Sequence, residues 1–113
     1  MDKLAKYRHL TKQLLSKYAE VINRSANPNQ EIEVVIDEER DHYLLLTMGW
    51  RQKRRVKGNT VHIRLKGNKF WVEEDGLEHG IATDLLEAGV PNEDIVLAFH
   101  HPNMRPYTEF AVS

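Results

Sequence analysis

The segment VHIRLKGNKFWV, residues 61–72, decides the fold class of this chain. Apolar and polar residues alternate on both sides of Gly67-Asn68, and a period of two is typical of a β-strand with one buried face. Gly67-Asn68 suits a two-residue hairpin turn, because glycine readily adopts a positive φ. The predicted hairpin pairs Leu65 with Phe70 and Ile63 with Val72 on its buried face, and Arg64 with Trp71 and His62 with Glu73 on the other.

An amphipathic helix is predicted upstream, over residues 4–24. Its apolar residues recur at spacings of three and four and therefore share one face. Asn27-Pro28-Asn29 ends this helix, because proline excludes the α-helical conformation for the residue before it. The apolar face consists of Leu4, Tyr7, Leu14, Tyr18 and Val21, and is widened by Leu10, Leu15 and Ile22.

Further elements lie on both sides of the hairpin. Residues 32–36 are rich in β-branched side chains, which favour a strand. Residues 42–50 carry large apolar groups on both faces, which is typical of a central strand that is covered on both sides. The elements expected after the hairpin are a helix over residues 81–88 that Gly89 ends, a strand over residues 95–99, and a tail, residues 100–113, that wraps the surface.

Together these elements predict a single α+β domain over residues 1–113, in the order α-β-β-β-β-α-β. Short connections between consecutive strands imply a mostly antiparallel sheet with the helices packed on it. A length of 113 residues suits one domain. Hydrophobic residues make up 41% of the chain and charged residues 29%, a balance that is typical of globular rather than disordered chains.

The composition excludes several classes of function. The chain has no cysteine, which removes disulfides, thiolate catalysis and cysteine-based zinc or iron–sulfur sites. No apolar run reaches the roughly 20 residues that a membrane-spanning helix needs. The first residues lack the apolar core of a secretion signal, so we expect a cytoplasmic protein that binds no membrane.

No group of residues has a strong claim to catalysis. Residues 37–41 carry acids at alternate positions, as a calcium loop does, but His42 stands where the EF-hand pattern needs glycine and Met48 where it needs glutamate. Asp41-His42 can supply two members of a hydrolytic triad, yet no serine lies in a recognised nucleophile motif. The six histidines form no HExxH pair. We therefore expect neither an enzyme nor a metal or cofactor site.

Residues 51–57, with the sequence RQKRRVK, are the most strongly charged segment. Their cations can contact nucleic-acid phosphates. Alternatively, the cations belong to a solvated hairpin tip and keep strand edges from pairing. The nearby acids of residues 37–41 can also neutralise these cations. The formal net charge of -1 gives no wider basic field and favours this second interpretation. The candidate nucleic-acid contacts are Arg51, Lys53, Arg54, Arg55 and Lys57.

Trp71 is the strongest candidate for a protein interface. Large aromatic side chains beside arginine are typical interface anchors, and Trp71 can form an exposed patch with Arg64 and Trp50. Alternatively, a helix covers Trp71 and the residue belongs to the core. The edges of a small sheet, together with an exposed Trp71, also favour a homodimer.

Short segments distributed along the whole chain carry a further signal. They are Met1-Asp2-Lys3-Leu4 with Tyr7, Glu39-Arg40-Asp41-His42-Tyr43, Gly49-Trp50, Arg54-Arg55-Val56 with Gly58, Asp75-Gly76, Gly80-Ile81-Ala82, Glu87-Ala88-Gly89-Val90-Pro91, Asp94-Ile95-Val96-Leu97 and Tyr107-Thr108-Glu109-Phe110-Ala111-Val112. In this order they resemble the XisI-like proteins, which are called fdxN element excision controlling factors. The resemblance implies a cyanobacterial accessory protein for programmed DNA excision, working beside a recombinase and a companion called XisH. It brings no catalytic or cofactor residue.

Three functions stay open at this point. The first is a non-enzymatic accessory factor that binds a protein partner, either a XisH-like companion or a recombinase; the near-neutral charge and the missing catalytic constellation favour it. The second is direct DNA binding through residues 51–57. The third is inhibition of a companion nuclease, which shares the binding prediction but differs in its effect on cells.

Overall fold

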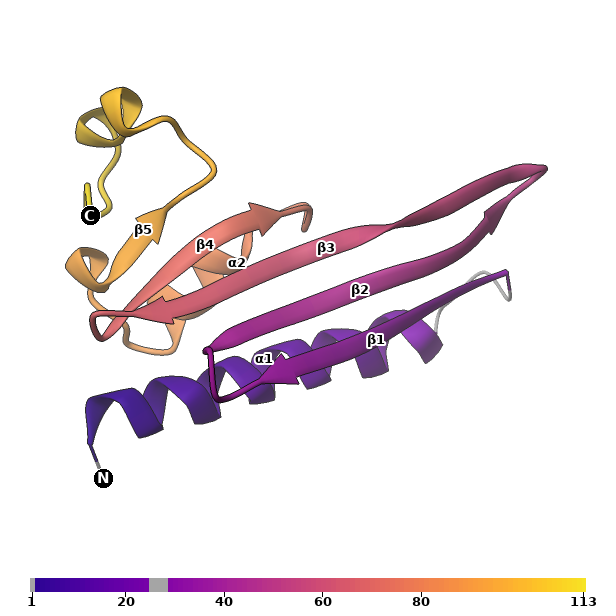
Figure 1. The fold of residues 1–113 in the computed structure, drawn as a ribbon, viewed down its shortest axis with the longest axis horizontal. Coiled ribbons are helices and arrows are strands. Elements are labelled where there is room, and N and C mark those ends of the chain that lie inside the picture. The colour runs from indigo at the N-terminus through magenta and orange to yellow at the C-terminus, as the bar shows by residue number, and fades with distance from the viewer. Residues whose placement is uncertain (1, 25–28) are drawn as a thin grey trace.

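The hairpin of residues 61–72 lies inside a five-stranded sheet with helices on one face (Figure 1). The computed structural model describes residues 2–24 and 29–113. The strands lie in the order β1-β2-β3-β4-β5; the first four are antiparallel neighbours, and β5 runs parallel to β4. The elements are α1 Lys3–Arg24, β1 Gln30–Asp37, β2 His42–Arg51, β3 Arg54–Lys66, β4 Lys69–Asp75, α2 Ile81–Glu87, η1 Asn92–Asp94, β5 Ile95–Leu97 and η2 Pro102–Tyr107.

The predicted α+β class, the order of the elements and the mostly antiparallel sheet are confirmed. The helix predicted over residues 4–24 is α1, while the predicted helix stop at Asn27-Pro28 lies outside the described residues. The strand expected over residues 95–99 ends at Leu97. In the described part of the chain, no helix combines the length and the apolar character that crossing a bilayer requires.

The predicted hairpin register is right over most of its length and wrong at one pair. Gly67 and Asn68 both have φ of 59°, as a two-residue turn of this kind requires. Leu65 lies opposite Phe70, Arg64 opposite Trp71 and Ile63 opposite Val72, as predicted. A β-bulge follows, and His62 faces Glu74 rather than Glu73. Glu73 is the extra residue of this bulge, because a bulge sets two residues of one strand against one of the other.

One face of the sheet forms the core together with both helices. α1 packs on β1, β2 and β3. Leu15 of α1 and Leu85 of α2 have no solvent-accessible surface. The strand residues of this core are Ile32 of β1, Tyr43 and Leu45 of β2, Val61, Ile63 and Leu65 of β3, Phe70 and Val72 of β4, and Ile95 of β5.

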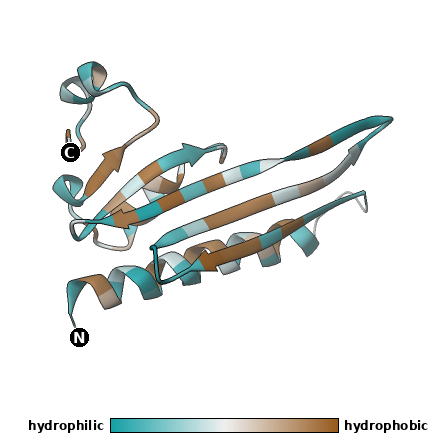
Figure 2. Ribbon diagram, viewed as in Figure 1, coloured by the Kyte–Doolittle hydropathy of each residue, from teal (hydrophilic) through white to brown (hydrophobic). Residues whose placement is uncertain are grey.

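The opposite face of β2 departs from the expectation. β2 is an interior strand, but the helices cover only the face that carries Tyr43 and Leu45. Leu44, Leu46 and Met48 point the other way and are partly exposed, although Figure 2 shows the middle of β2 as a continuous hydrophobic stretch. The prediction that β2 is covered on both sides is therefore wrong for the described part of the chain. Among the residues described, α1 and α2 form a single helix layer on the sheet.

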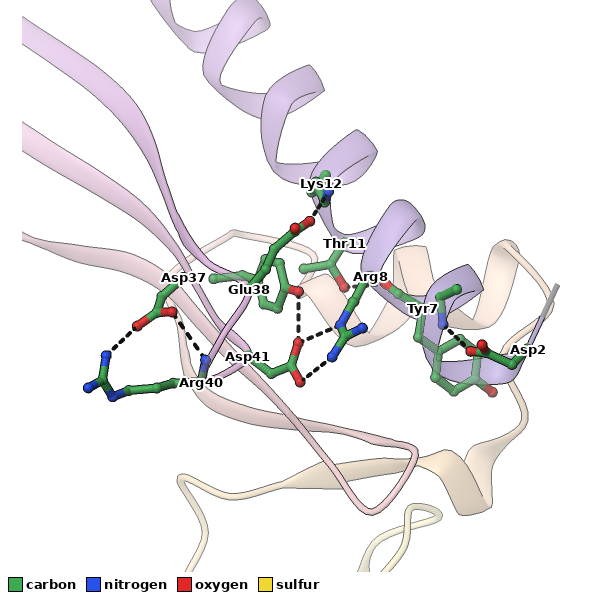
Figure 3. Close-up of polar contacts among 11 residues, drawn as sticks. Asp2, Tyr7, Arg8, Thr11, Lys12, Asp37, Glu38, Arg40 and Asp41 are labelled. Atoms are coloured by element: carbon green, nitrogen blue, oxygen red, sulfur yellow. Dashed lines mark hydrogen bonds and ion pairs between the residues drawn. The ribbon is translucent and has the colours of Figure 1, made fainter.

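A half-buried carboxylate ties α1 to the turn between β1 and β2 (Figure 3). Arg8 donates two hydrogen bonds to Asp41, at 2.8 and 3.0 Å, and the hydroxyl of Tyr43 donates a third at 3.0 Å. The hydrogen bonds from Arg8 hold the pKa of Asp41 below its ordinary value against the opposing effect of burial. Asp41 therefore serves the packing of the turn against α1.

Replacing Asp41 with alanine is expected to destabilise the fold by about 1–3 kcal/mol, because the buried hydroxyl of Tyr43 and the guanidinium of Arg8 lose their acceptor. Urea unfolding monitored by circular dichroism measures the change. Asp37→Ala is the matched control from the same turn, since Asp37 bonds the exposed Arg40 and the backbone of Glu39 and makes no bond to α1 among the residues described. Equal destabilisation by both variants would contradict the role given to Asp41.

Candidate functional site

The cations of residues 51–57 lie at the end of a two-stranded ribbon (Figure 1). β4 pairs only with the part of β3 from Val61 onward, and β1 pairs with β2 only up to Gly49. Toward their connecting turn, β2 and β3 therefore have only each other as neighbours among the described strands. We call residues 51–57 the basic tip. All five of its cations are exposed: Arg51, Lys53, Arg54, Arg55 and Lys57.

Within the described residues, no acidic side chain forms an ion pair with the basic tip. The acids of residues 37–41 lie at the opposite end of β2, roughly 30 Å away along a strand of ten residues. There, Glu38 pairs with Lys12, and Asp41 pairs with Arg8. These acids do not neutralise the tip. A chain with a net charge close to zero thus carries an uncompensated positive end.

Trp50 packs against Arg55 at the base of the basic tip. The guanidinium of Arg55 lies 5.2 Å from the centre of the Trp50 ring, within the range of a cation–π contact. The two residues are also cross-strand partners. Trp50 remains 49% exposed, so the tip presents a stacked indole and guanidinium to solvent.

The structure brings Trp71 and Arg64 together and separates Trp50 from both. Arg64 lies opposite Trp71, whereas Trp50 lies opposite Arg55 near the other end of β3. Neither α1 nor α2 covers Trp71; instead, the cationic groups of Lys66 and of Arg105 in η2 lie 5.0 and 5.7 Å from its ring centre. Its indole nitrogen donates to the carbonyl oxygen of Lys66 at 3.2 Å. Trp71 is therefore half-buried beneath the C-terminal segment.

Three strands expose the sheet face that lies away from the helices. We call this surface the open face, and it excludes Trp71, which Arg105 covers. Acidic and apolar side chains of β1, apolar side chains of β2 and polar or basic side chains of β3 line it. The residues of the open face are Glu31, Glu33 and Val35; His42, Leu44, Leu46, Met48 and Trp50; and Arg55, Lys57, Asn59, His62 and Arg64.

Two histidines contact each other on the open face. His42 Nδ1 lies 2.9 Å from His62 Nε2, so one of these two nitrogens carries no proton and accepts. Burial lowers the pKa of His62 below its ordinary value, and His42 and Arg64 lower it further, while Glu73 and Glu74 oppose the shift. The sequence offered no signal for this pair, because the contact depends on the register between β2 and β3.

A buried carboxylate lies beside a cavity of about 570 Å³ between α1 and the segment after α2. Asp94 accepts a hydrogen bond from the hydroxyl of Tyr7 at 2.5 Å and forms an ion pair with Lys3 at 2.6 Å. Burial opposes the ionisation of Asp94, but Lys3 and Tyr7 outweigh it and hold its pKa below the ordinary value. The described residues contain no cluster of three or more His, Asp or Glu side chains that could hold a metal ion.

Comparison with known proteins identifies the family. The family model described as XisI protein matches residues 1–112. The chain belongs to the XisI family. Among solved structures, a crystal structure of a XisI-like protein from Anabaena variabilis ATCC 29413 is 34% identical, with a TM-score of 0.89, over 97% of this chain and 99% of the other.

A second XisI-family structure is described by its role. The fdxN element excision controlling factor XisI, also from Anabaena variabilis ATCC 29413, is 39% identical, with a TM-score of 0.83, over 99% of this chain and all of the other. No protein with a curated description matches the chain. The resemblance to XisI-like proteins inferred from the short segments is therefore confirmed.

The burial of His62 is expected to make stability depend on pH. The folded state favours neutral His62, so this contribution is fully present above the unfolded pKa of about 6.5 and is lost as the pH falls through the lower folded value. His62→Gln is expected to flatten the pH dependence of the melting temperature between about pH 7 and pH 5. His9→Gln is the control, since His9 is exposed. A profile that stays unchanged in His62→Gln would contradict the assignment.

Proposed function

We propose that this XisI-family protein is a non-enzymatic accessory factor of programmed DNA excision that binds duplex DNA with its basic tip. One observation carries the proposal: the five cations of the tip have no acidic partner among the described residues. The description of the relative as an excision controlling factor supports the setting. The near-zero net charge argues less against DNA than the sequence implies, because the acids of residues 37–41 lie at the other end of β2 and pair with residues other than the tip cations.

The shape of the tip suits this function. A two-stranded β-ribbon fits the major groove of B-DNA, and β2 and β3 form such a ribbon around the turn at Gln52-Lys53. Arginine and lysine side chains that neutralise phosphates release counterions, so affinity falls steeply with salt. If all five cations engage phosphates, the slope of log K against log salt is about −4.5. The expected affinity is largely independent of base sequence, because phosphate contacts carry no sequence information.

Charge reversal at Arg51 and Arg54 tests this function. These two residues face each other across the ribbon, and their substitution by glutamate is expected to weaken binding more than tenfold and to reduce the salt slope by about 2. Gel retardation and fluorescence anisotropy with a short duplex at several salt concentrations measure both effects.

A second double variant gives the matched control. Lys6 and Lys17 are exposed cations of α1, and changing both to glutamate alters the net charge equally. The control is expected to retain the wild-type salt slope and most of the affinity. Wild-type binding by the Arg51→Glu, Arg54→Glu protein would overturn the assignment of DNA binding to the tip.

A protein partner is the second candidate, and the C-terminal segment favours it. Met104 is 54% exposed and Tyr107 is 85% exposed, and both lie in η2. Arg105 holds this segment by donating to the carbonyl oxygens of Ala98 and His100 at 3.3 and 3.1 Å. Exposed apolar side chains on a fixed scaffold are typical of interaction sites, and tyrosine is frequent among interface anchors. The partner would be a recombinase or a XisH-like companion.

Copurification with the product of a neighbouring companion gene tests this candidate. Tyr107→Ala combined with Met104→Ala is expected to reduce recovery of the companion at least tenfold, since buried anchors of this kind contribute about 1–2 kcal/mol each. Ile36→Ala, which trims an exposed apolar residue of β1, serves as the control. Undiminished recovery would contradict the use of η2. Toxicity of the companion expressed alone, relieved by this chain, would identify the protein as an inhibitor.

A further inference from the structure

The open face carries three rows of side chains that differ in charge. The β1 row is acidic at Glu31 and Glu33, and both residues are exposed. The β2 row is apolar at Leu44, Leu46 and Met48, and the β3 row contains Lys57 and Asn59. The registers align Glu31, Met48 and Lys57 at one level and Glu33, Leu46 and Asn59 at the next. Acidic and basic rows therefore flank an apolar row at equal spacing.

Nothing in the described part of the chain covers the apolar row. Both helices pack on the other face of the sheet, and the C-terminal segment covers Trp71 of β4 while leaving β1, β2 and the tip end of β3 free (Figure 1). Val35 and Trp50 extend the apolar surface and are 41% and 49% exposed. A sheet face with a continuous apolar row normally packs against a second layer.

We infer that the second layer is another copy of this chain, packed face to face with the first. The two copies are related by a two-fold axis that lies between the sheets and parallel to β2. Such an axis sets Met48 against Met48 and Leu46 against Leu46 of the other copy. It also carries the β1 row of each copy over the β3 row of the other, so Glu31 faces Lys57 and Glu33 faces the amide group of Asn59. Two sheets pack about 10 Å apart with their strands nearly aligned, which brings these side chains into contact.

The charges of the β1 and β3 rows favour this axis over the other two-fold arrangement of two stacked sheets, although it also sets the two basic tips at the same end. An axis across the strands would superimpose β1 on β1 and β3 on β3, which sets Glu31 and Glu33 near the acids of the second copy and Lys57 near its own equivalent. Like charges in register are unfavourable. The axis along β2 makes the face complementary to itself, as a two-fold interface requires.

The axis along β2 has a consequence for the basic tips. Rotation about this axis preserves the strand direction, so both tips emerge at the same end of the dimer. The inference goes beyond the proposed function, because the interface is made by the open face, which shares Arg55 and Lys57 with the tip but not Arg51 and Arg54. Arg51 and Arg54 alternate with the residues of the open face and point away from it.

Sedimentation equilibrium of the purified chain at micromolar to millimolar concentration tests the inference. The wild type is expected to dimerise, and Met48→Glu to abolish the dimer. Glu31→Lys and Lys57→Glu each set like charges together at two places in the dimer and are expected to raise the dissociation constant about tenfold. An equimolar mixture of the two variants restores both opposite-charge contacts, so a mixed dimer of wild-type affinity is expected.

The controls separate this inference from the proposed function. The Arg51→Glu, Arg54→Glu protein is expected to remain a dimer while it loses DNA, and thermal unfolding checks that every variant folds. A wild-type chain that is monomeric throughout this concentration range would overturn the inference and leave the open face to a different protein. A dimer that neither single variant weakens, or a mixture no stronger than its components, would equally overturn it.

Discussion

The alternation of buried apolar and outward-facing polar residues along β3 is the constraint on which the rest of the structure depends. Val61, Ile63 and Leu65 are buried, and their neighbours on both adjacent strands are held in register by the same burial. A slip of one residue would expose this whole set. The helices follow from this arrangement, because α1 and α2 supply the apolar side chains that complete a single core. The β1–β2 turn in turn depends on α1, since Asp41 takes its hydrogen bonds from Arg8.

Local patterns predict this fold well because most of its strands are joined by short turns. The hairpin of residues 61–72 could be read from alternation and from Gly67-Asn68 alone. The bulge at Glu73 could not, since one extra residue leaves the apolar pattern around it unchanged. The apolar residues on both faces of β2 predicted two covering layers. The chain has helices for one layer, so the second face stays open within the described residues.

The residues of the candidate sites could be predicted from the sequence, but their positions relative to one another in the fold could not. The cations of residues 51–57 are evident in the sequence, whereas their isolation depends on which end of β2 carries the acids. Trp50 and Trp71 are both prominent aromatic residues, yet they belong to opposite ends of β3. The contact of His42 with His62 depends on strand pairing, and that of Tyr7 with Asp94 joins elements at opposite ends of the chain. No local spacing encodes such contacts.

The bond between Tyr7 and Asp94 spans 87 residues, and this separation bears on how the chain is made. During synthesis, α1 leaves the ribosome before the strands on which it packs, and the carboxylate that holds its first turns emerges only after β4 and α2. The strands from β1 to β4 can pair as they appear, because their contacts are local. We therefore expect α1 to dock fully only after Asp94 has emerged, with contact order rather than helix formation limiting the folding rate.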